Sequence, residues 1–236
     1  MNLKLASIAL LPFLAVQGQR VKRNTPRLAE PEGARQGCVG QGRPLSILIV
    51  GDSAAAGVGV ATQSQALLEQ LLACLDGHYQ ISYLLEAKTG RTTAQLIRAV
   101  QALSIQKVDV VITSIGVNDV TRLIPVNVWM QQQKRLYAVI QNKFNPQLIL
   151  AASVPPIYLF PALPQPMAWL LGEYAKQMNQ QLQAYVQKQS QMLYLDYDLE
   201  QYQAMNLSMA EDDFHPSQEI YAFWAKTMAE KIQAQF

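Results

Sequence analysis

The stretch LSILIVGDSAAAGVG, residues 45–59, decides the fold. Its apolar run Ile47–Val50 is short and largely β-branched, which is typical of a strand buried on both faces of a parallel sheet. The run stops at Gly51-Asp52-Ser53, where glycine lets the backbone turn sharply. A serine at this point places its hydroxyl at the carboxyl edge of the sheet, where open α/β sheets bind ligands. The same residues also fit an ordinary strand-to-helix turn, so this stretch alone leaves both interpretations open.

Apolar runs alternate with helical patterns along the rest of the chain, which predicts a parallel sheet with helices on both faces and right-handed crossovers. The predicted strands are Ile47–Val50, Ile81–Leu85, Val108–Ile115, Leu148–Ala152 and Met192–Leu195. The predicted helices are Gln65–Leu75, Thr93–Leu103, Val126–Lys143, Ala168–Lys188 and Gln218–Ala234. We expect residues 45–236 to form one domain, preceded over residues 1–44 by a hydrophobic segment and a Gly/Pro-rich arm, Arg27–Pro44.

Composition excludes several classes of function. The formal net charge of the 236 residues is +2, and basic residues do not cluster in the body of the chain, so nothing indicates a nucleic-acid partner. The two cysteines, Cys38 and Cys74, are too few for a disulfide framework and too distant for a metal knuckle, and they are either one bridge or two free thiols. Only two histidines, His78 and His215, are present, which excludes a histidine-rich metal site.

The amino terminus has three open interpretations. Leu5–Val16 is apolar apart from Ser7 and follows Lys4, as in the central region of a signal peptide. It is shorter than the ~20 residues that span a bilayer. Cations from Arg20 to Arg27 follow it, which disfavours translocation of that flank. We expect a periplasmic or secreted protein, or one that is membrane-associated through this segment, with a cytoplasmic protein as the alternative. If the segment is not a signal peptide, it is a helix that packs on the domain or lies at a membrane surface.

A serine nucleophile needs a base, and the choice is between two histidines. His78 lies in the turn-like Asp76–Tyr79, at the amino edge of the sheet, and is expected to be plain surface. His215 precedes the last helix, and Pro216 restricts the local backbone. Asp212, three residues earlier, is placed to bind the other ring nitrogen and to stabilise an imidazolium. The same pair also fits a simple helix start.

Acyl transfer also needs hydrogen-bond donors for an oxyanion. Two loops at carboxyl ends of strands supply candidates, namely the Gly90 N–H in Lys88–Thr92 and the Asn118 amide in Gly116–Asp119. The Ser53 N–H completes a three-donor set. Each loop alone is more often a turn than a site. Asp52 and Asp119 are expected to hydrogen-bond within their own loops.

Taken together, Gly51-Asp52-Ser53, Gly90, Gly116-Val117-Asn118-Asp119 and Asp212-x-x-His215 resemble the four signature blocks of the SGNH hydrolases, the GDSL-type esterases and lipases. The resemblance covers residues 45–236 and implies a flavodoxin-like three-layer α/β/α sandwich, here with a five-stranded, mostly parallel sheet. It also implies catalytic Ser53, Asp212 and His215, with Ser53, Gly90 and Asn118 as the oxyanion hole. Ala54 replaces the leucine of the Gly-Asp-Ser-Leu motif.

Asp213 stands where a glycine is common, and the spacing favours Asp212 as the partner of His215. Within the family, the exported bacterial thioesterase and lysophospholipase type is the most similar that we can suggest.

The expected activity is hydrolysis of carboxylic esters or thioesters of small acyl or lipid substrates through an acyl-enzyme, without a metal or organic cofactor. Tyr158 and Phe160 in the proline-rich segment Val154–Pro166 favour an acyl-chain substrate if they line the pocket. The alternatives are a carbohydrate O-deacetylase on the same fold and a non-catalytic binding protein. The N-terminal segment is the part of the chain expected to contact a membrane.

Overall fold

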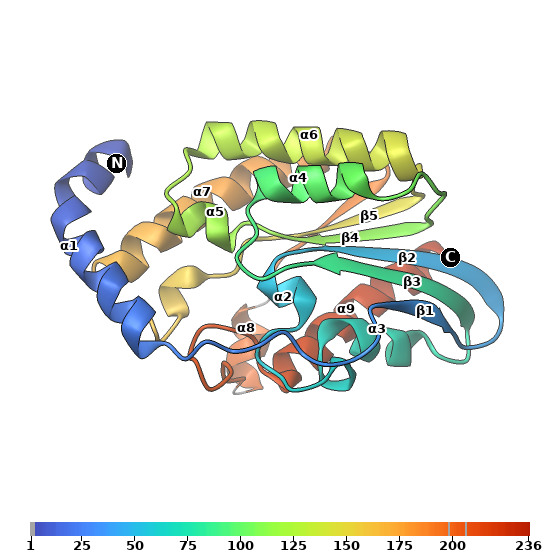
Figure 1. Ribbon diagram of the computed structural model, residues 1–236. Coiled ribbons are helices and arrows are strands. Elements are labelled where there is room, and N and C mark those ends of the chain that lie inside the picture. The colour runs from blue at the N-terminus through green and yellow to red at the C-terminus, as the bar shows by residue number, and fades with distance from the viewer. Residues whose placement is uncertain (1–2, 198, 206) are drawn as a thin grey trace.

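The computed structural model describes residues 3–197, 199–205 and 207–236, which form a sheet covered by helices on both faces (Figure 1). The strands are β1 Gln36–Val39, β2 Arg43–Gly51, β3 Tyr79–Ala87, β4 Val110–Ser114, β5 Leu148–Ala152 and β6 Met192–Leu195. Their order in the sheet is β1-β3-β2-β4-β5-β6, and β1 runs antiparallel to β3 while the other neighbours are parallel. The predicted α/β architecture is confirmed, with six strands in the described residues instead of five.

The helices form two layers around this sheet. They are α1 Leu3–Asn24, α2 Ser53–Ala56, α3 Leu67–Leu75, α4 Thr93–Ala102, α5 Val117–Thr121, α6 Val126–Phe144, α7 Met167–Val186, α8 Leu199–Ala204 and α9 Gln218–Gln235, with 3-10 turns η1 Gln63–Gln65 and η2 Ile157–Leu159. Helices α4, α6 and α7 cover one face, and α3 and α9 cover the other (Figure 1). The chain leaves the parallel strands on the side where α2 and α5 lie.

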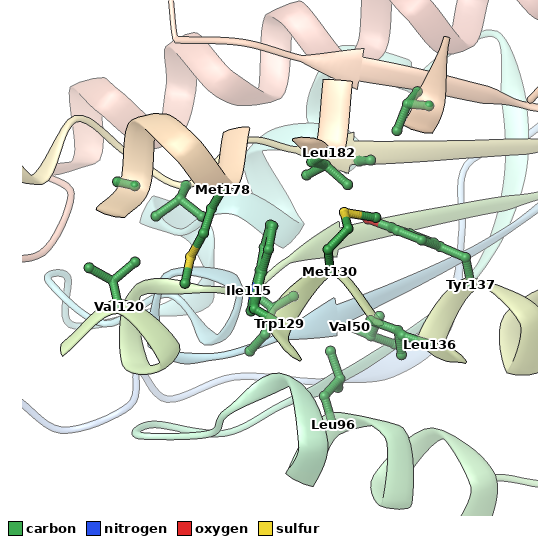
Figure 2. Close-up of a cluster of buried hydrophobic side chains, with 14 of the residues drawn as sticks. Val50, Leu96, Ile115, Val120, Trp129, Met130, Leu136, Tyr137, Met178 and Leu182 are labelled. Atoms are coloured by element: carbon green, nitrogen blue, oxygen red, sulfur yellow. The ribbon is translucent and has the colours of Figure 1, made fainter. Parts of the chain in front are cut away.

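Alternation along β2 explains why both faces are covered. Leu48 and Val50 are buried under α4, α6 and α7, whereas Ile47 and Ile49 are buried under α3 and α9. Figure 2 shows part of the first cluster, in which Val50 lies among side chains from four helices. A strand that is covered on both faces has apolar residues at consecutive positions, as in the run at residues 47–50.

The arm expected over Arg27–Pro44 is partly wrong, because it contains β1 and the first residues of β2. All four residues of β1 are exposed, so the strand is held by backbone pairing to β3 and leaves no apolar pattern to detect. Other predicted elements differ at their ends. The predicted helix Gln65–Leu75 begins as η1 and continues as α3, and the predicted strand Val108–Ile115 is the shorter β4.

The hydrophobic N-terminal segment belongs to α1, which lies beside the start of α7 (Figure 1). Its Ser7 Oγ lies 3.1 Å from the hydroxyl of Tyr174, and the Gln17 amide donates to the carbonyl of Gln165 at 2.6 Å. No helix in the described part of the chain has both the length and the apolar character needed to cross a bilayer. Cys38 and Cys74 are exposed free thiols.

Candidate active site

Ser53 is the first residue of α2, directly beyond the end of β2. The turn depends on Gly51, because a Cβ there would lie 2.1 Å from the carbonyl oxygen of Ser114 on the neighbouring strand. Asp52 then caps α2, and its Oδ1 accepts the Ala54 N–H at 3.2 Å. The strand, the glycine and the cap together direct the Ser53 side chain to the carboxyl edge of the sheet.

The structure brings Ser53, His215 and Asp212 together although residues 53 and 215 are 162 positions apart. The His215 Nε2 lies 3.0 Å from the Ser53 Oγ, and the His215 Nδ1 lies 2.5 Å from the Asp212 Oδ2. The histidine loop approaches closely because residue 59 is glycine. A Cβ on Gly59 would lie 2.2 Å from the carbonyl oxygen of Pro216. An alcohol, an imidazole and a carboxylate in series can move a proton off the alcohol.

Asp212, not Asp213, faces the imidazole. Asp212 is buried, and its Oδ1 accepts the backbone N–H groups of Phe214 and His215 at 3.0 and 2.9 Å. Asp213 is exposed and takes a left-handed conformation with φ of 55°, the region that usually favours glycine. The turn at Asp213 therefore folds the Asp212 side chain back over the following residues.

The two carboxylates nearest the site have opposite electrostatics. Burial of the Asp212 carboxyl disfavours its charge, but hydrogen bonds from the ring and backbone of His215 outweigh burial and lower its pKa. Burial raises the pKa of Asp52 to about 7, even though N–H groups of Ala54 and Gly116 favour its charge. Asp212 is thus held as an anion ready to support an imidazolium.

The two predicted oxyanion loops lie at the same end of the sheet. Gly90 has a φ of 77°, and a Cβ there would meet nothing within 4 Å, so its backbone borders open space. The Asn118 Nδ2 donates to the carbonyl of Arg91 at 3.1 Å, and Asn118 lines one cavity with His215 and Asp212. Thr89, next to Gly90, lines the same cavity. Asn118 and the loop of Gly90 thus border the cavity that His215 also lines.

The prediction that Asp119 bonds within its own loop gives only part of its contacts, since its carboxylate bonds its own backbone N–H and also reaches another loop. Its carboxylate accepts the backbone N–H and the hydroxyl of Thr93 at 3.0 and 2.9 Å, so it ties the loop of Asn118 to the start of α4. The Gln133 amide of α6 donates to the same Thr93 hydroxyl at 3.1 Å. Neither partner has a signal in the sequence, because both contacts join distant segments. The prediction for Asp52 agrees with its bond to Ala54.

Two cavities meet at His215. The first, which we call the aromatic cavity, has a volume of about 450 Å³ and opens at Ser53. Its apolar lining includes Leu159, Phe160, Tyr202, Leu207, Phe214 and Trp224. The second, the helix-side cavity, has a volume of about 680 Å³ and lies between α1 and the loops of Asn118 and His215. Phe214 and His215 line both cavities.

The proline-rich segment Val154–Pro166 contributes to the aromatic cavity only in part. Phe160 lines it, but Tyr158 packs over Gly172 of α7 and lines a separate hollow that Ser53 does not reach. Tyr158 and Phe160 are only two positions apart, but the turn η2 directs their side chains to different cavities. Sequence reasoning also missed the contributions of α1 and of Tyr202 and Trp224, which no motif marks.

The sequence matches the model of the GDSL-like lipase/acylhydrolase family over residues 49–223, more than half of the chain, and the protein belongs to this family. It is therefore a hydrolase of ester bonds. The matched range includes Ser53, Gly90, Asn118, Asp212 and His215. No curated protein matches the sequence.

Solved structures share the fold at low sequence identity. A lipolytic protein of the G-D-S-L family from Veillonella parvula is 14% identical with a TM-score of 0.63, and the match covers 81% of this chain and 100% of that one. An acetylxylan esterase from Geobacillus stearothermophilus is 18% identical with a TM-score of 0.59, covering 81% and 95%. The psychrotrophic esterase EstA from Pseudoalteromonas sp., inhibited by monoethylphosphonate, is 18% identical with a TM-score of 0.59, covering 80% and 97%.

Proposed function

We propose that this protein hydrolyses carboxylic esters or thioesters of acyl and lipid substrates through an acyl-enzyme on Ser53. The observation that carries the proposal is the hydrogen-bonded series of Ser53, His215 and Asp212 beside an apolar cavity. Ester hydrolysis itself follows from the family. The family alone assigns neither the roles of these residues nor the substrate class.

In the first half of the reaction, the His215 Nε2 takes the proton of the Ser53 hydroxyl as its oxygen attacks the substrate carbonyl carbon. The negative charge on the carbonyl oxygen is held by the N–H groups of Ser53 and Gly90 and the Asn118 amide. The Asp212 carboxylate stabilises the imidazolium and fixes its tautomer. The bond to the leaving oxygen or sulfur then breaks, and that atom takes the proton from Nε2.

In the second half, water replaces the alcohol. His215 takes a proton from water as its oxygen attacks the acyl carbon, and the bond from carbon to the Ser53 Oγ breaks with return of that proton to Oγ. The products are a carboxylic acid and the free enzyme. Every proton transfer passes through Nε2, which is why its 3.0 Å separation from Oγ is central.

Ser53→Ala tests the nucleophile. We expect loss of p-nitrophenyl ester hydrolysis to the uncatalysed rate, with an unchanged circular dichroism spectrum. A fluorophosphonate probe should label Ser53 in the wild type and nothing in the variant, as read by peptide mass spectrometry. Substantial turnover by Ser53→Ala, or labelling at another residue of folded protein, contradicts the assignment.

A carbohydrate O-deacetylase is the second candidate, because the acetylxylan esterase has this fold. An acetyl group would leave most of the aromatic cavity unfilled, whereas a longer acyl chain would bury apolar surface there. Comparison of acetylated xylan with p-nitrophenyl decanoate decides between the two. A third possibility, a binding protein without activity, predicts no hydrolysis even of p-nitrophenyl acetate.

Contact with an anionic lipid surface is also proposed for α1. Its outward face exposes Leu5, Ile8 and Phe13, and no acidic residue precedes Glu30, whereas Lys22 and Arg23 occupy its last turn. Co-sedimentation with phosphatidylglycerol vesicles should weaken in 0.5 M salt and on Phe13→Ser. Equal sedimentation with neutral and anionic vesicles would contradict a role for charge. Export by cleavage of the same segment stays a prediction, tested by intact mass.

A further inference from the structure

The helix-side cavity has a wall outside the region that carries the family signature. The family match begins at residue 49, whereas α1 ends at Asn24. Leu10, Leu14 and Val21 of α1 pack against the hydrophobic core, and Leu3 is buried in it. The bonds from Ser7 toward Tyr174 and from Gln17 to Gln165 hold the helix at two further points. The wall is therefore fixed to the domain.

The lining of this cavity joins aliphatic side chains to proposed catalytic ones, and it also includes the polar side chains of Lys22, Thr25, Arg27, Thr89 and Thr121. Aliphatic surface comes from Leu14 and Val21 of α1 and from Leu123, Leu163, Met167 and Leu171 opposite. The inner end is formed by Asn118, Asp212 and His215. Its volume of about 680 Å³ is in the range of small-molecule sites. An apolar group that entered here would have one end beside His215, whose ring bonds Ser53 in the adjoining cavity.

We propose that the helix-side cavity binds an aliphatic chain of the ester, so that α1 determines chain-length specificity. This inference rests on the proposed function, because it places the chain relative to the Ser53 acyl-enzyme. The carbonyl carbon of an ester has two substituents, and two cavities diverge from His215. An aliphatic lining favours each added methylene by about fourfold in affinity while the chain stays inside.

Gly18 is the position at which the cavity can be filled with least disturbance. It lines the cavity from α1, and a Cβ there would meet only the Met167 Cε, at 3.7 Å, which is ordinary contact. Gly18→Ala therefore fits, and Gly18→Phe extends a ring into the cavity. Ala15 is exposed on the same helix, so Ala15→Phe adds a ring to solvent and serves as the matched control.

The experiment measures kcat/KM of the full-length variants on two series of substrates. One varies the acyl chain of p-nitrophenyl esters from acetate to laurate, and the other varies the alcohol of alkyl acetates from methyl to decyl. We expect Gly18→Phe to lower the ratio of long-chain to short-chain kcat/KM at least tenfold in one series. Ala15→Phe should stay within twofold of the wild type, and Gly18→Ala should lower the ratio less than Gly18→Phe. The affected series shows whether the acyl or the alcohol chain enters the cavity.

Identical profiles for Gly18→Phe and Ala15→Phe in both series, with p-nitrophenyl acetate still hydrolysed, overturn the cavity assignment alone. A wild-type chain that hydrolyses no ester in either series overturns the proposed function as well. If circular dichroism shows that Gly18→Phe does not fold, Val21→Trp fills the same cavity from the next turn of α1 and is subject to the same two outcomes.

Discussion

Asp52 and Asp212 are both buried at the carboxyl edge of the sheet, and each is 2% exposed. Their pKa values are nevertheless shifted in opposite directions. Asp212 accepts two backbone N–H groups and the His215 ring, and these donors lower its pKa in spite of burial. Burial dominates for Asp52 and raises its pKa to about 7. Two side chains with the same small exposure thus have pKa values shifted in opposite directions, because Asp52 is more strongly desolvated and Asp212 has more hydrogen-bond donors.

Between these two carboxyl groups, the larger effect on activity is expected from removing the charge of Asp212. Asp212→Asn keeps the shape but cannot stabilise an imidazolium and favours the wrong tautomer, so kcat should fall roughly 10³- to 10⁴-fold. Steady-state hydrolysis of p-nitrophenyl butyrate measures this loss. Asp213→Asn is the matched control and should stay within twofold, because Asp213 lines the aromatic cavity but Asp212 is the residue that bonds the His215 ring. Equal losses in the two variants would contradict the assignment of Asp212.

Hydrogen-bond donors distinguish Asp212 from Asp52, and Asn118 is a donor that we propose acts on the substrate instead. Asn118→Ala removes the amide that we propose as an oxyanion donor, so kcat should fall about 10²- to 10³-fold with little change in KM. The loss belongs to the transition state because a neutral carbonyl gains little from this amide. A rise in KM with unchanged kcat would instead make Asn118 a simple binding residue.

Asp52→Asn sharpens the comparison through stability. The Asp52 pKa is raised in the folded state from an ordinary value of 3.8 to about 7, so folding binds a proton and stability falls as pH rises from about 4 to about 7. The amide carries no charge to bury and keeps an oxygen for the Ala54 N–H. We expect a gain at pH 8 of roughly 2 kcal/mol in the free energy of unfolding, below a ceiling of about 4 kcal/mol.

Urea unfolding at pH 5 and pH 8 measures this effect. The advantage of Asp52→Asn over the wild type should be larger at pH 8, where the wild-type carboxyl is ionised in both states. An equal difference at the two pH values would show that the folded-state pKa of Asp52 is not raised.

The positions of Ser53, Asp212 and His215 were predictable from sequence because each lies in a short local pattern at an end of a strand or helix. The covered strands were predictable for a similar reason, since burial on both faces leaves a continuous apolar run at residues 47–50. The exposed β1 left no such pattern, because its stability comes from backbone pairing with β3. The local sequence therefore indicates which residues are buried more directly than it indicates which segments pair.

Long-range contacts around the site were missed for the same reason. The bond from Asp119 to Thr93 spans 26 residues, and neither side chain indicates the other. Tyr158 and Phe160 could not be distinguished from the sequence, but only Phe160 lines the aromatic cavity in the folded chain. For α1, an apolar segment after a lysine fits export and packing alike, and its contacts with α7 and the helix-side cavity exist only in the folded chain.

The smallest effect is expected at the second histidine, which extends the comparison from carboxylates to imidazoles. His78 is exposed at the amino end of β3, whereas His215 lies between Ser53 and Asp212 at the opposite end of the sheet. His78→Gln should change kcat/KM less than twofold, while His215→Gln should abolish turnover. The pH–rate profile of His78→Gln should match that of the wild type, because the proposed general base is His215, which bonds Ser53. A displaced profile would mean that His78 influences the reacting groups from across the sheet, and position at the carboxyl edge would no longer separate the two imidazoles.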